Sequence, residues 1–533
     1  MAKDLIFNPS KGISNSPLSE NAFSQCIDND SENGIAKVNY ETDKQTVDLS
    51  TGYTFTADTG TELLTVSTAT EWTTGTAVQF TTSGTLPNPL ATSTVYYLRK
   101  ATTTTFYVHT TFDDAINATS TVNLTTTGSG THTTTPIEVE NIKKFIGSYA
   151  LDAQGNFWKI VSDGVWELLS KGSGSGNTLE QYKNYIYLCR GGDIDRWLIS
   201  TETLTASWQT DSATNAIVGQ DDVLYFAAGN ELRSWDDSTF TSSALDLPEG
   251  ETITAIAELG RFLAMGTNQN KIFLWDRVST TFELPISTQG DIEMLIPANN
   301  LLYFVIDSGD LYVTNGSSAE LVKEFPRHIL TNKEYPSFQF QKYGWRVQNR
   351  DIYIGYGSTS TVQPMGIYQY SLEDGDFKLA YTVSADTGEE TSANKMRIDA
   401  LQDSKYGAFF IGATRGGSTY LVDRVSLTKR YTSYRAEVRS PFYKVGKRYQ
   451  TTTYKHTEVS LSEKLKTGQG IRVSYRTDLS ASWTTIGTFS TVNKISTVLD
   501  KTINNLEYIQ LRAELTTNQD EFTPKLLEIR LYD

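Results

Sequence analysis

The sequence is poor in the residues that build disulfide frameworks and most metal centres. Its 533 residues include only two cysteines, Cys26 and Cys189, which lie far apart, and four scattered histidines. Two thiols cannot make a disulfide framework or a thiolate metal cluster, and four scattered imidazoles do not predict a multi-histidine site. We therefore expect no bound metal and no cofactor.

Positive charge and long hydrophobic runs are also scarce. The chain has 46 lysine and arginine residues against 62 aspartate and glutamate residues, a formal net charge of −16. Such a chain is poorly suited to general binding of nucleic-acid backbones or anionic membranes. No apolar run approaches the roughly 20 residues that span a bilayer, and Met1 to Phe7 lacks the apolar stretch of a signal peptide. These absences predict a protein without a membrane span, made and kept in a reducing compartment.

The sequence does contain an internal repeat. A short strand rich in aliphatic and aromatic residues recurs seven times, at intervals of 37, 38, 38, 40, 50 and 57 residues. The seven strands are anchored at Tyr149, Ile186, Leu224, Phe262, Leu302, Ile352 and Phe409. After most anchors comes a turn rich in glycine, asparagine or aspartate, typical of hairpins. A second strand follows and carries an aromatic residue, at Trp158, Trp197, Trp235, Trp275, Tyr312 or Tyr420.

A strand-rich repeat of about 40 residues predicts a β-propeller, in which each blade buries its faces against its neighbours. Seven anchors predict seven blades. The pairs Trp235-Asp236 and Trp275-Asp276 resemble those of Trp-Asp repeat propellers, but no histidine here follows a glycine, as that family requires in each blade. We interpret the two pairs as turn features.

The composition changes on both sides of the repeats. Residues 46–135 are about one-third threonine, with apolar and aromatic residues alternating through them, which predicts a small β-domain. Residues 441–533 hold cleanly alternating strands, such as Ile471 to Tyr475, typical of a half-buried sandwich. The predicted fold is all-β: a seven-bladed β-propeller (136–440) with an inserted small β-domain (46–135) and a C-terminal, jelly-roll-like β-sandwich (441–533). Residues 1–45 are expected to join the propeller.

Three segments resemble parts of tailed-bacteriophage virion proteins. A small β-module of phage tail and tail-tip proteins is similar to the threonine-rich segment, at Gly75 to Phe80, Gly84 to Leu90, Tyr96 to Leu98 and Gly128 to Thr133. The start of phage propeller proteins, where a short strand precedes or closes the ring, resembles Phe7 to Ile13 and Ser16 to Ala22. The jelly-roll domain that often follows such propellers is similar to Ser440 to Gly446 and Ile471 to Trp483.

This resemblance implies a non-enzymatic structural component of the virion tail, as a nozzle, tail-tip or head-to-tail ring protein. It would form a rigid channel wall and docking surface, in a closed ring with copies of itself and beside other tail or neck proteins. DNA would pass only as cargo, and the protein would be made in the host cytoplasm. The chain is shorter than one large nozzle type of short-tailed phages and carries the inserted module. Two rivals stay open: a tail protein that binds or degrades a host surface glycan or receptor, and a propeller lectin.

An enzymatic function would depend on carboxylates, because glycoside hydrolysis needs two at a defined separation. The candidate pairs all fall in predicted turns, where we expect solvated residues: Asp193/Asp195, Asp221/Asp222 and Asp236/Asp237. The turn motif of sialidases is matched only in part, at Ser384 to Gly388, and Thr477-Asp478 with Trp483 is a second partial match. No phosphate-binding loop or nucleophile elbow is present. We therefore expect no catalytic residue and no enzyme.

Positive charge is concentrated near the start of the C-terminal domain. Lys429 to Arg476 holds twelve basic and three acidic residues, a net charge of +9, so the rest of the chain carries −25. Either these residues are a solvated linker and sheet face, or they meet an acidic propeller of a neighbouring subunit or partner. The interface residues expected on the second interpretation are Lys444, Lys447, Arg448 and Lys455.

The sequence also predicts where several aromatic residues lie and where loops project from the propeller. Tyr187, Tyr225 and Tyr303 lie in apolar strands and are expected in the core, whereas Trp345 and Tyr356 are candidates for exposed loops. The two longest intervals between repeats predict projecting loops, at Leu330 to Pro336, Gly357 to Met365 and Ser384 to Asn394.

Overall fold

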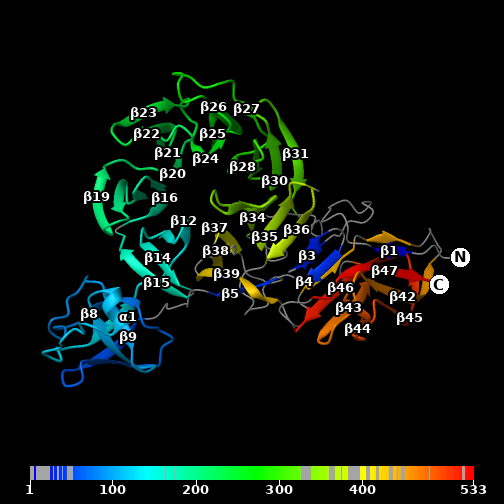
Figure 1. Ribbon diagram of the computed structural model, residues 1–533, viewed down its shortest axis with the longest axis horizontal. Helices are drawn as coiled ribbons and strands as arrows, with labels where there is room; N and C mark the ends of the chain where they lie inside the picture. The colour runs from blue at the N-terminus through cyan, green and yellow to red at the C-terminus, as the bar shows by residue number, and fades with distance from the viewer. Residues whose placement is uncertain are drawn as a thin grey trace.

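The computed structural model describes residues 5–7, 25–27, 29–32, 35–38, 40–44, 52–162, 164–172, 174–325, 338–358, 366–373, 375–381, 396–403, 409–415, 419–430, 436–440, 442–445, 451–478, 481–518 and 523–533. Nearly all regular structure in these ranges is antiparallel β-strand, and their one helix is α1 (Phe112–Asn117). Figure 1 shows a ring of sheets, a small barrel beside it, and a pair of sheets that carries both labelled chain ends.

Five separate four-stranded sheets follow one another around the ring, each with its strands in sequence order. The first two are β12 (Ile142–Ile146), β13 (Tyr149–Asp152), β14 (Phe157–Ser162), β15 (Val165–Ser170), and β16 (Gly176–Tyr182), β17 (Tyr185–Arg190), β18 (Asp193–Leu198), β19 (Thr203–Gln209). The next two are β20 (Asn215–Val218), β21 (Leu224–Ala228), β22 (Glu231–Trp235), β23 (Phe240–Asp246), and β24 (Ile253–Leu259), β25 (Phe262–Thr267), β26 (Lys271–Trp275), β27 (Ile286–Ser287). The fifth is β28 (Ile292–Ala298), β29 (Leu301–Ile306), β30 (Asp310–Thr314), β31 (Ala319–Glu324).

A nine-stranded sheet completes the ring. Its strands run in the order β36 (Phe377–Tyr381), β35 (Gly366–Ser371), β34 (Asp351–Ser358), β37 (Met396–Asp403), β38 (Phe409–Arg415), β39 (Thr419–Arg430) and β5 (Tyr40–Lys44), with β32 (Phe338–Gln339) and β33 (Trp345–Gln348) both paired to β34. Only Ser358 and Met396 join β34 to β37, so the sheet is nearly divided there.

Seven strands contact one another in a closed cycle around the ring. β12 contacts β16, and the contacts continue through β20, β24, β28, β33 and β37 back to β12. The ring is therefore a β-propeller, with these strands toward its middle (Figure 1).

In the five four-stranded sheets, the repeat anchor lies in the second strand and the aromatic residue that follows it lies in the third. In the nine-stranded sheet, Ile352 and Phe409 lie in β34 and β38, and Tyr420 lies in β39. Neighbouring sheets cover both faces of the second strand: in β29, Leu302 to Ile306 are all buried. In the outermost strand β31, no residue is buried. The second strand thus carries the strongest hydrophobic signal in each repeat. Tyr187, Tyr225 and Tyr303 are buried, which confirms their predicted place in the core.

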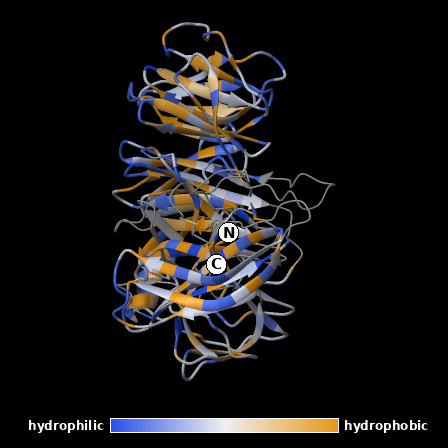
Figure 2. Cartoon of the chain, turned by 90° about the vertical axis from the view of Figure 1, so that its right-hand side faces the viewer, coloured by the Kyte–Doolittle hydropathy of each residue, from blue (hydrophilic) through white to orange (hydrophobic). Residues whose placement is uncertain are grey.

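Two six-stranded sheets form the second unit. One has the order β3 (Asn29–Glu32), β4 (Ile35–Val38), β47 (Leu526–Tyr532), β42 (Thr452–Leu461), β45 (Ser496–Leu506), with β1 (Leu5–Phe7) also on β47. The other, the arginine-bearing sheet, has the order β2 (Gln25–Ile27), β40 (Ala436–Arg439), β46 (Tyr508–Thr517), β43 (Gln469–Arg476), β44 (Thr484–Phe489), with β41 (Tyr443–Lys444) also on β46. Buried residues of both sheets share one hydrophobic cluster. In Figure 2, hydrophobic and hydrophilic segments alternate along the strands near the two termini.

The N-terminal strands are divided between the two units. Within residues 1–45, β5 pairs with β39 in the ring, whereas β1 to β4 pair in the six-stranded sheets. The prediction that residues 1–45 join the propeller therefore holds for β5 but not for β1 to β4, and β40 pairs in a six-stranded sheet although it lies before the predicted boundary at residue 440. These strands pair with partners far away in the sequence, and such pairing leaves no local pattern.

The threonine-rich segment forms a closed six-stranded barrel. Its strands are β6 (Tyr53–Asp58), β7 (Leu63–Val66), β8 (Thr76–Thr82), β9 (Tyr96–Lys100), β10 (Thr105–His109) and β11 (His132–Pro136), in the order β10-β7-β6-β11-β8-β9. The hydroxyl of Tyr97 donates to the carbonyl of Leu168 at 2.7 Å, and the amide of Ile137 donates to Ala77 at 2.8 Å. Side chains of Ala77 and Tyr97 also pack with Trp166 of β15. The barrel is thus fixed against the first sheet of the ring (Figure 1).

Candidate functional site

A short segment between β32 and β33 fastens the first strands together inside the ring. The hydroxyls of Tyr343 and Thr178 of β16 are 2.7 Å apart, and the amide of Leu401 in β37 donates to the carbonyl of Tyr343 at 3.0 Å. Lys144 of β12 lies over the Tyr343 ring, 4.4 Å from its centroid, and donates to Glu180 at 2.7 Å. We call Lys342 and Tyr343 the inner clasp.

The inner clasp carries a buried cation. The ammonium of Lys342 donates to the carbonyl of Thr214, which precedes β20. Burial, with the neighbouring charges of Lys144 and Lys143, lowers the pKa of Lys342 to about 7. A hydrogen bond to one carbonyl compensates only part of the desolvation of an ammonium. The contacts of the inner clasp join strands of the ring to one another, so its role is structural.

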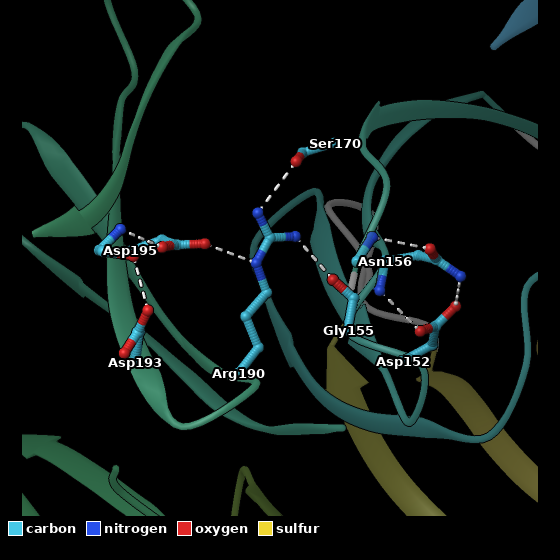
Figure 3. A network of polar contacts seen from close by, with 9 residues as sticks. Asp152, Gly155, Asn156, Ser170, Arg190, Asp193 and Asp195 are labelled. Carbon is cyan, nitrogen blue, oxygen red and sulfur yellow. Dashed lines mark hydrogen bonds and ion pairs between the residues drawn. The ribbon is translucent and has the colours of Figure 1, made fainter. Parts of the chain in front are cut away.

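A second buried polar network links the first two sheets of the ring (Figure 3). The carboxylate of Asp152 accepts hydrogen bonds at 2.9 Å from the amides of Gln154 and Asn156, the Asn156 side chain and the Trp158 indole. Burial raises the pKa of Asp152. Because four donors surround it, this carboxylate stabilises the turn between β13 and β14.

Arg190 extends the network across the sheet boundary. Its Nε donates to Asp195 at 2.7 Å, Nη1 to the carbonyl of Gly155 at 2.6 Å and Nη2 to Ser170 at 2.9 Å (Figure 3). Asp195 also accepts from the amide of Ser207 at 2.6 Å. Both side chains of the pair are about nine-tenths buried. The network ties β17 and β18 to the sheet before them.

The structure corrects the prediction for Asp193 and Asp195. Both lie in strand β18 rather than in a turn, and Asp195 is buried in its pairing with Arg190. The glycine pair before them, Gly191 and Gly192, takes the turn with positive φ. The sequence missed this because the strand begins directly at the first carboxylate.

The other two carboxylate pairs lie where the sequence predicted. Asp221 and Asp222 are exposed between β20 and β21, and Asp236 and Asp237 are exposed between β22 and β23. The carboxylate of Asp236 accepts from the amides of Ser238 and Thr239 at 2.9 and 2.6 Å.

The second Trp-Asp pair behaves in the same way. The carboxylate of Asp276 accepts from the amides of Val278 and Ser279 at 3.0 and 2.7 Å. The interpretation of both Trp-Asp pairs as turn features is therefore confirmed. Of the partial matches to the sialidase turn motif, Ser384 to Gly388 lies outside the described residues, and Asp478 accepts from the amide of Ala481 at 2.9 Å.

Of the four predicted interface residues, the two that the structure describes lie in different sheets. Lys444 is exposed in β41, with its ammonium 5.6 Å from the ring centroid of Tyr508. Lys455 is exposed in β42, in the other six-stranded sheet, and lies 3.0 Å from a carboxylate oxygen of Asp533. Lys447 and Arg448 lie outside the described residues.

The structure reveals a group of cations that the sequence did not single out. In the arginine-bearing sheet, Arg439 is opposite Arg512, Gln510 is opposite Arg476, and Glu514 is opposite both Glu437 and Arg472. Directly opposed residues share a face, and Lys444 opposite Tyr508 extends the same row. We call this surface the arginine face; its cations are Lys444, Arg439, Arg472, Arg476 and Arg512.

Two buried carboxylates neutralise part of this charge. Arg472 binds Glu514 through two hydrogen bonds of 2.9 and 2.6 Å, and Arg512 lies 3.0 Å from Glu514. Arg439 and Arg512 both reach Glu437.

An indole lies against the centre of the arginine face. The guanidiniums of Arg476 and Arg512 are each 4.6 Å from the ring centroid of Trp483, and that of Arg439 is 5.5 Å away. Such stacking stabilises a guanidinium without neutralising it. Burial, together with the like charge of Arg439, lowers the pKa of Arg476 to about 10. Three guanidiniums thus lie around one indole.

A sequence signal for the arginine face exists in hindsight. Charged or polar residues recur at every second position of Arg472 to Arg476 and of Gln510 to Glu514, as expected for one face of a strand. The pairing of β46 with both β40 and β43 could not be inferred, because the three strands lie far apart in the sequence.

Two aromatic residues are placed differently from the expectation. Tyr356 is buried in β34, where its ring packs on Phe325, Phe340 and Tyr368. Trp345 is half-buried, and its indole donates to the carbonyl of Lys342 at 2.9 Å. Strand β34 is longer than the repeat suggested, and it draws Tyr356 into the core.

A pocket lies between the barrel and the first sheet of the ring, lined by residues that include Thr74, Ile137, Trp158 and Trp166. Its cavity volume is about 70 Å³, well below the 300–1,000 Å³ of sites that enclose a small-molecule ligand. The pocket therefore gives no support to a glycan site here.

The remaining candidate features are the buried cysteine, groupings of metal ligands and membrane-spanning helices. Cys189 is fully buried in β17, and burial raises the pKa of its thiol to about 12. Among the described residues, no three His, Cys, Asp or Glu side chains are grouped so as to hold a metal ion. Nor does the described part of the chain contain a helix long and apolar enough to cross a membrane.

The comparisons with known proteins place this chain in no family. No family model matches it, and no curated protein matches it. Among solved structures, it is similar to a computationally designed protein, Ika8, with 15% identity over 57% of this chain and 94% of the other, at a TM-score of 0.35. It is also similar to the WD40 β-propeller domain of Doa1 (12% identity, 54% of this chain, 94% of the other, TM-score 0.40) and to a chain of a mitotic checkpoint complex (12%, 54%, 87%, TM-score 0.40).

Proposed function

We propose that this protein is a structural component of a tailed-bacteriophage virion, located in the tail as a nozzle, tail-tip or head-to-tail ring protein. It acts as a rigid wall and docking surface rather than as an enzyme. The proposal comes from the resemblance of three segments to phage tail proteins. The observation that supports it best is that strand pairing and packing join all three segments to the ring or to one another.

Strands near the N-terminus pair in both the ring and the six-stranded sheets, which makes the molecule rigid. Strand β5 pairs with β39 in the ring, while β1 to β4 pair with C-terminal strands. Strand β36 of the ring also contacts β2 and β3. The barrel is fixed to β15 by the Tyr97 hydrogen bond and by shared hydrophobic packing. A part that must carry load between neighbours in a tail needs this kind of interlocking.

We further propose that the ring has seven blades. The nine-stranded sheet then counts as two blades, β33 to β36 and β37 to β39 with β5. The closed cycle of seven contacting first strands and the single residue pair between β34 and β37 support this count. In the same proposal, the two six-stranded sheets with their shared core are a jelly-roll-like sandwich.

The decisive experiment is a reconstruction of the native phage particle that contains this chain. Density for the ring, barrel and paired sheets, repeated around the tail axis, is the expected result. Absence of the chain from purified particles would contradict the proposal. Reproducible cleavage of a host surface glycan by the purified protein would favour the rival enzymatic function.

A further inference from the structure

Three buried polar atoms lie together between the second and third sheets of the ring without hydrogen-bond partners. They are the phenol oxygen of Tyr187 in β17, Nε of Arg196 in β18 and the indole Nε1 of Trp235 in β22. Tyr187 and Arg196 are directly opposite each other, so their side chains share one face of the second sheet. Buried polar atoms in folded proteins are normally paired, and unpaired ones often mark a bound water or ion.

The three groups are close enough to affect one another. Burial raises the pKa of Tyr187 to about 12, so its phenol keeps its proton at neutral pH. The N–H groups of Trp235 and Arg196 act against this rise, although neither makes a hydrogen bond of normal geometry to the phenol. The ring of Trp208 in β19 packs on both neighbours, 5.1 Å from the Tyr187 centroid and 4.9 Å from that of Trp235.

The charge of Arg196 is balanced by aromatic rings rather than by an anion. Its guanidinium is 4.5 Å from the ring centroid of Tyr185 and 5.4 Å from that of Trp208. Within the described ranges, no carboxylate is at ion-pair distance from it. A carboxylate whose charge reaches Tyr187, that of Asp237, is exposed to solvent in the turn between β22 and β23. Stacking stabilises a guanidinium but does not neutralise it.

The three groups supply more donors than acceptors. The protonated phenol, the indole and the guanidinium Nε each donate one hydrogen bond, whereas the phenol oxygen alone among these atoms can accept. A water molecule would satisfy the donors but would leave the charge of Arg196 unpaired. An anion would satisfy the donors and also form a charge-assisted hydrogen bond with Arg196.

We infer that a small monovalent anion of the chloride class binds between Tyr187, Arg196 and Trp235. A small anion is favoured because the three donor atoms are covered by this chain's own side chains, which leaves no approach for a larger acid. The anion joins β17 and β18 of the second sheet to β22 of the third, and so fastens two neighbouring sheets of the ring (Figure 1). The inference concerns the cohesion of the ring and does not depend on the proposed virion function.

Chloride nuclear magnetic resonance of the full-length protein tests the site. Chloride that exchanges with a protein site broadens its resonance, so a titration measures its affinity. The variants Y187F and W235F each remove one donor and keep an aromatic ring, and R196M removes the charge. The matched control is W197F. It removes an indole Nε1 that is also buried without a partner, but its ring packs on Phe157 of the first sheet.

We expect the wild type and W197F to bind chloride equally and to melt at a higher temperature when chloride replaces gluconate at constant ionic strength. Y187F and W235F should each bind chloride about tenfold more weakly, because each loses one hydrogen bond to a charged group. R196M should lose both the binding and the stabilisation. In wild-type crystals soaked in bromide, anomalous density should lie between the three side chains. Y187F and W235F keep the test valid if R196M does not fold.

Several outcomes would overturn the anion site. One is chloride broadening that is the same for the wild type, Y187F and W235F. Another is a melting temperature that does not differ between chloride and gluconate for the wild type. Density for a water molecule but none for bromide between the three side chains would show that the donors are satisfied by water, which also contradicts the inference.

Discussion

The phenol oxygen of Tyr343 lies 2.7 Å from the hydroxyl oxygen of Thr178, a residue 165 positions earlier in the chain. This contact fixes the segment before β33 against β16. With Lys342 bound to Thr214 and Tyr343 bound to Leu401, the inner clasp touches sheets well separated in the ring. Its contacts make the middle of the ring sensitive to the charge state of Lys342.

Replacing Lys342 with methionine should stabilise the protein, and more so at low pH. The pKa of Lys342 is lowered from 10.5 to about 7, so the folded state binds fewer protons than the unfolded state between these values. Stability from this group therefore rises as the pH rises through that window. The gain in unfolding free energy of K342M over wild type should be about 2 kcal/mol larger at pH 6 than at pH 9. Urea denaturation at both pH values measures it, with exposed Lys494→Met as control.

The pH dependence of stability that Glu293 contributes should have the opposite sign to that of Lys342. Burial, with the charges of Asp307 and Asp291, raises its pKa to about 7. The folded state binds the extra proton, so stability is fully present below about pH 4 and is lost as the pH rises to 7. Glu293→Gln should raise the unfolding free energy by about 1–3 kcal/mol at pH 8 and leave it unchanged at pH 4. Equal effects at both pH values would contradict the assignment; Glu249→Gln, at an exposed site, is the control.

Removing one partner of the buried pair of Arg190 and Asp195 should lower the unfolding free energy strongly. Arg190→Met leaves the Asp195 carboxylate without its guanidinium, and losses of about 3–5 kcal/mol are typical of this change. The double variant R190M/D195N should lose less than the sum of the single variants. A double-mutant cycle by chemical denaturation measures the coupling. The more exposed pair of Lys159 and Glu202 should give only about 0.2–1 kcal/mol.

Deleting residues 46–135 should leave a folded ring that assembles poorly. The barrel packs on the ring through Ala77 and Tyr97, so its removal uncovers Trp166 without removing a ring strand. Near-ultraviolet circular dichroism should be retained, while tryptophan emission shifts to longer wavelength. Normal particle assembly would show that the barrel makes no contact between subunits. Tyr97→Phe, which removes only the bond to Leu168, should cost about 0.5–1.5 kcal/mol.

The propeller was predictable because its signal is local and repeated. Leu302 to Ile306 and the corresponding second strands are buried on both faces, and each is followed by a hairpin turn, so the period stands out. The loops expected at Leu330 to Pro336, at Ser384 to Asn394 and for most of Gly357 to Met365 lie outside the described residues; Gly357 itself is in β34. The pairing of Thr42 with Val425 left no comparable trace.

The sites were less predictable because they arise from pairing across strands. Charge density along the chain pointed to Lys429 to Arg476, yet the structure divides that stretch among three sheets. Its first two residues end β39 in the ring, while Lys444 and Lys455 lie in the two six-stranded sheets. Arg512, which completes the arginine face, lies outside the stretch altogether. The opposition of Arg439 and Arg512 depends on strand register, which composition does not encode.

The pairing of Leu5 with Leu531 has a consequence for synthesis. Strand β1 leaves the ribosome before its partner β47, which follows more than five hundred residues later. At 5–20 residues per second, the wait is roughly half a minute to two minutes. During that time β1, β3 and β4 have no finished sheet to join, and β5 must wait for β39 before the ring can close. Strands β1, β3 and β4 can therefore complete their sheet only after β47 has been made.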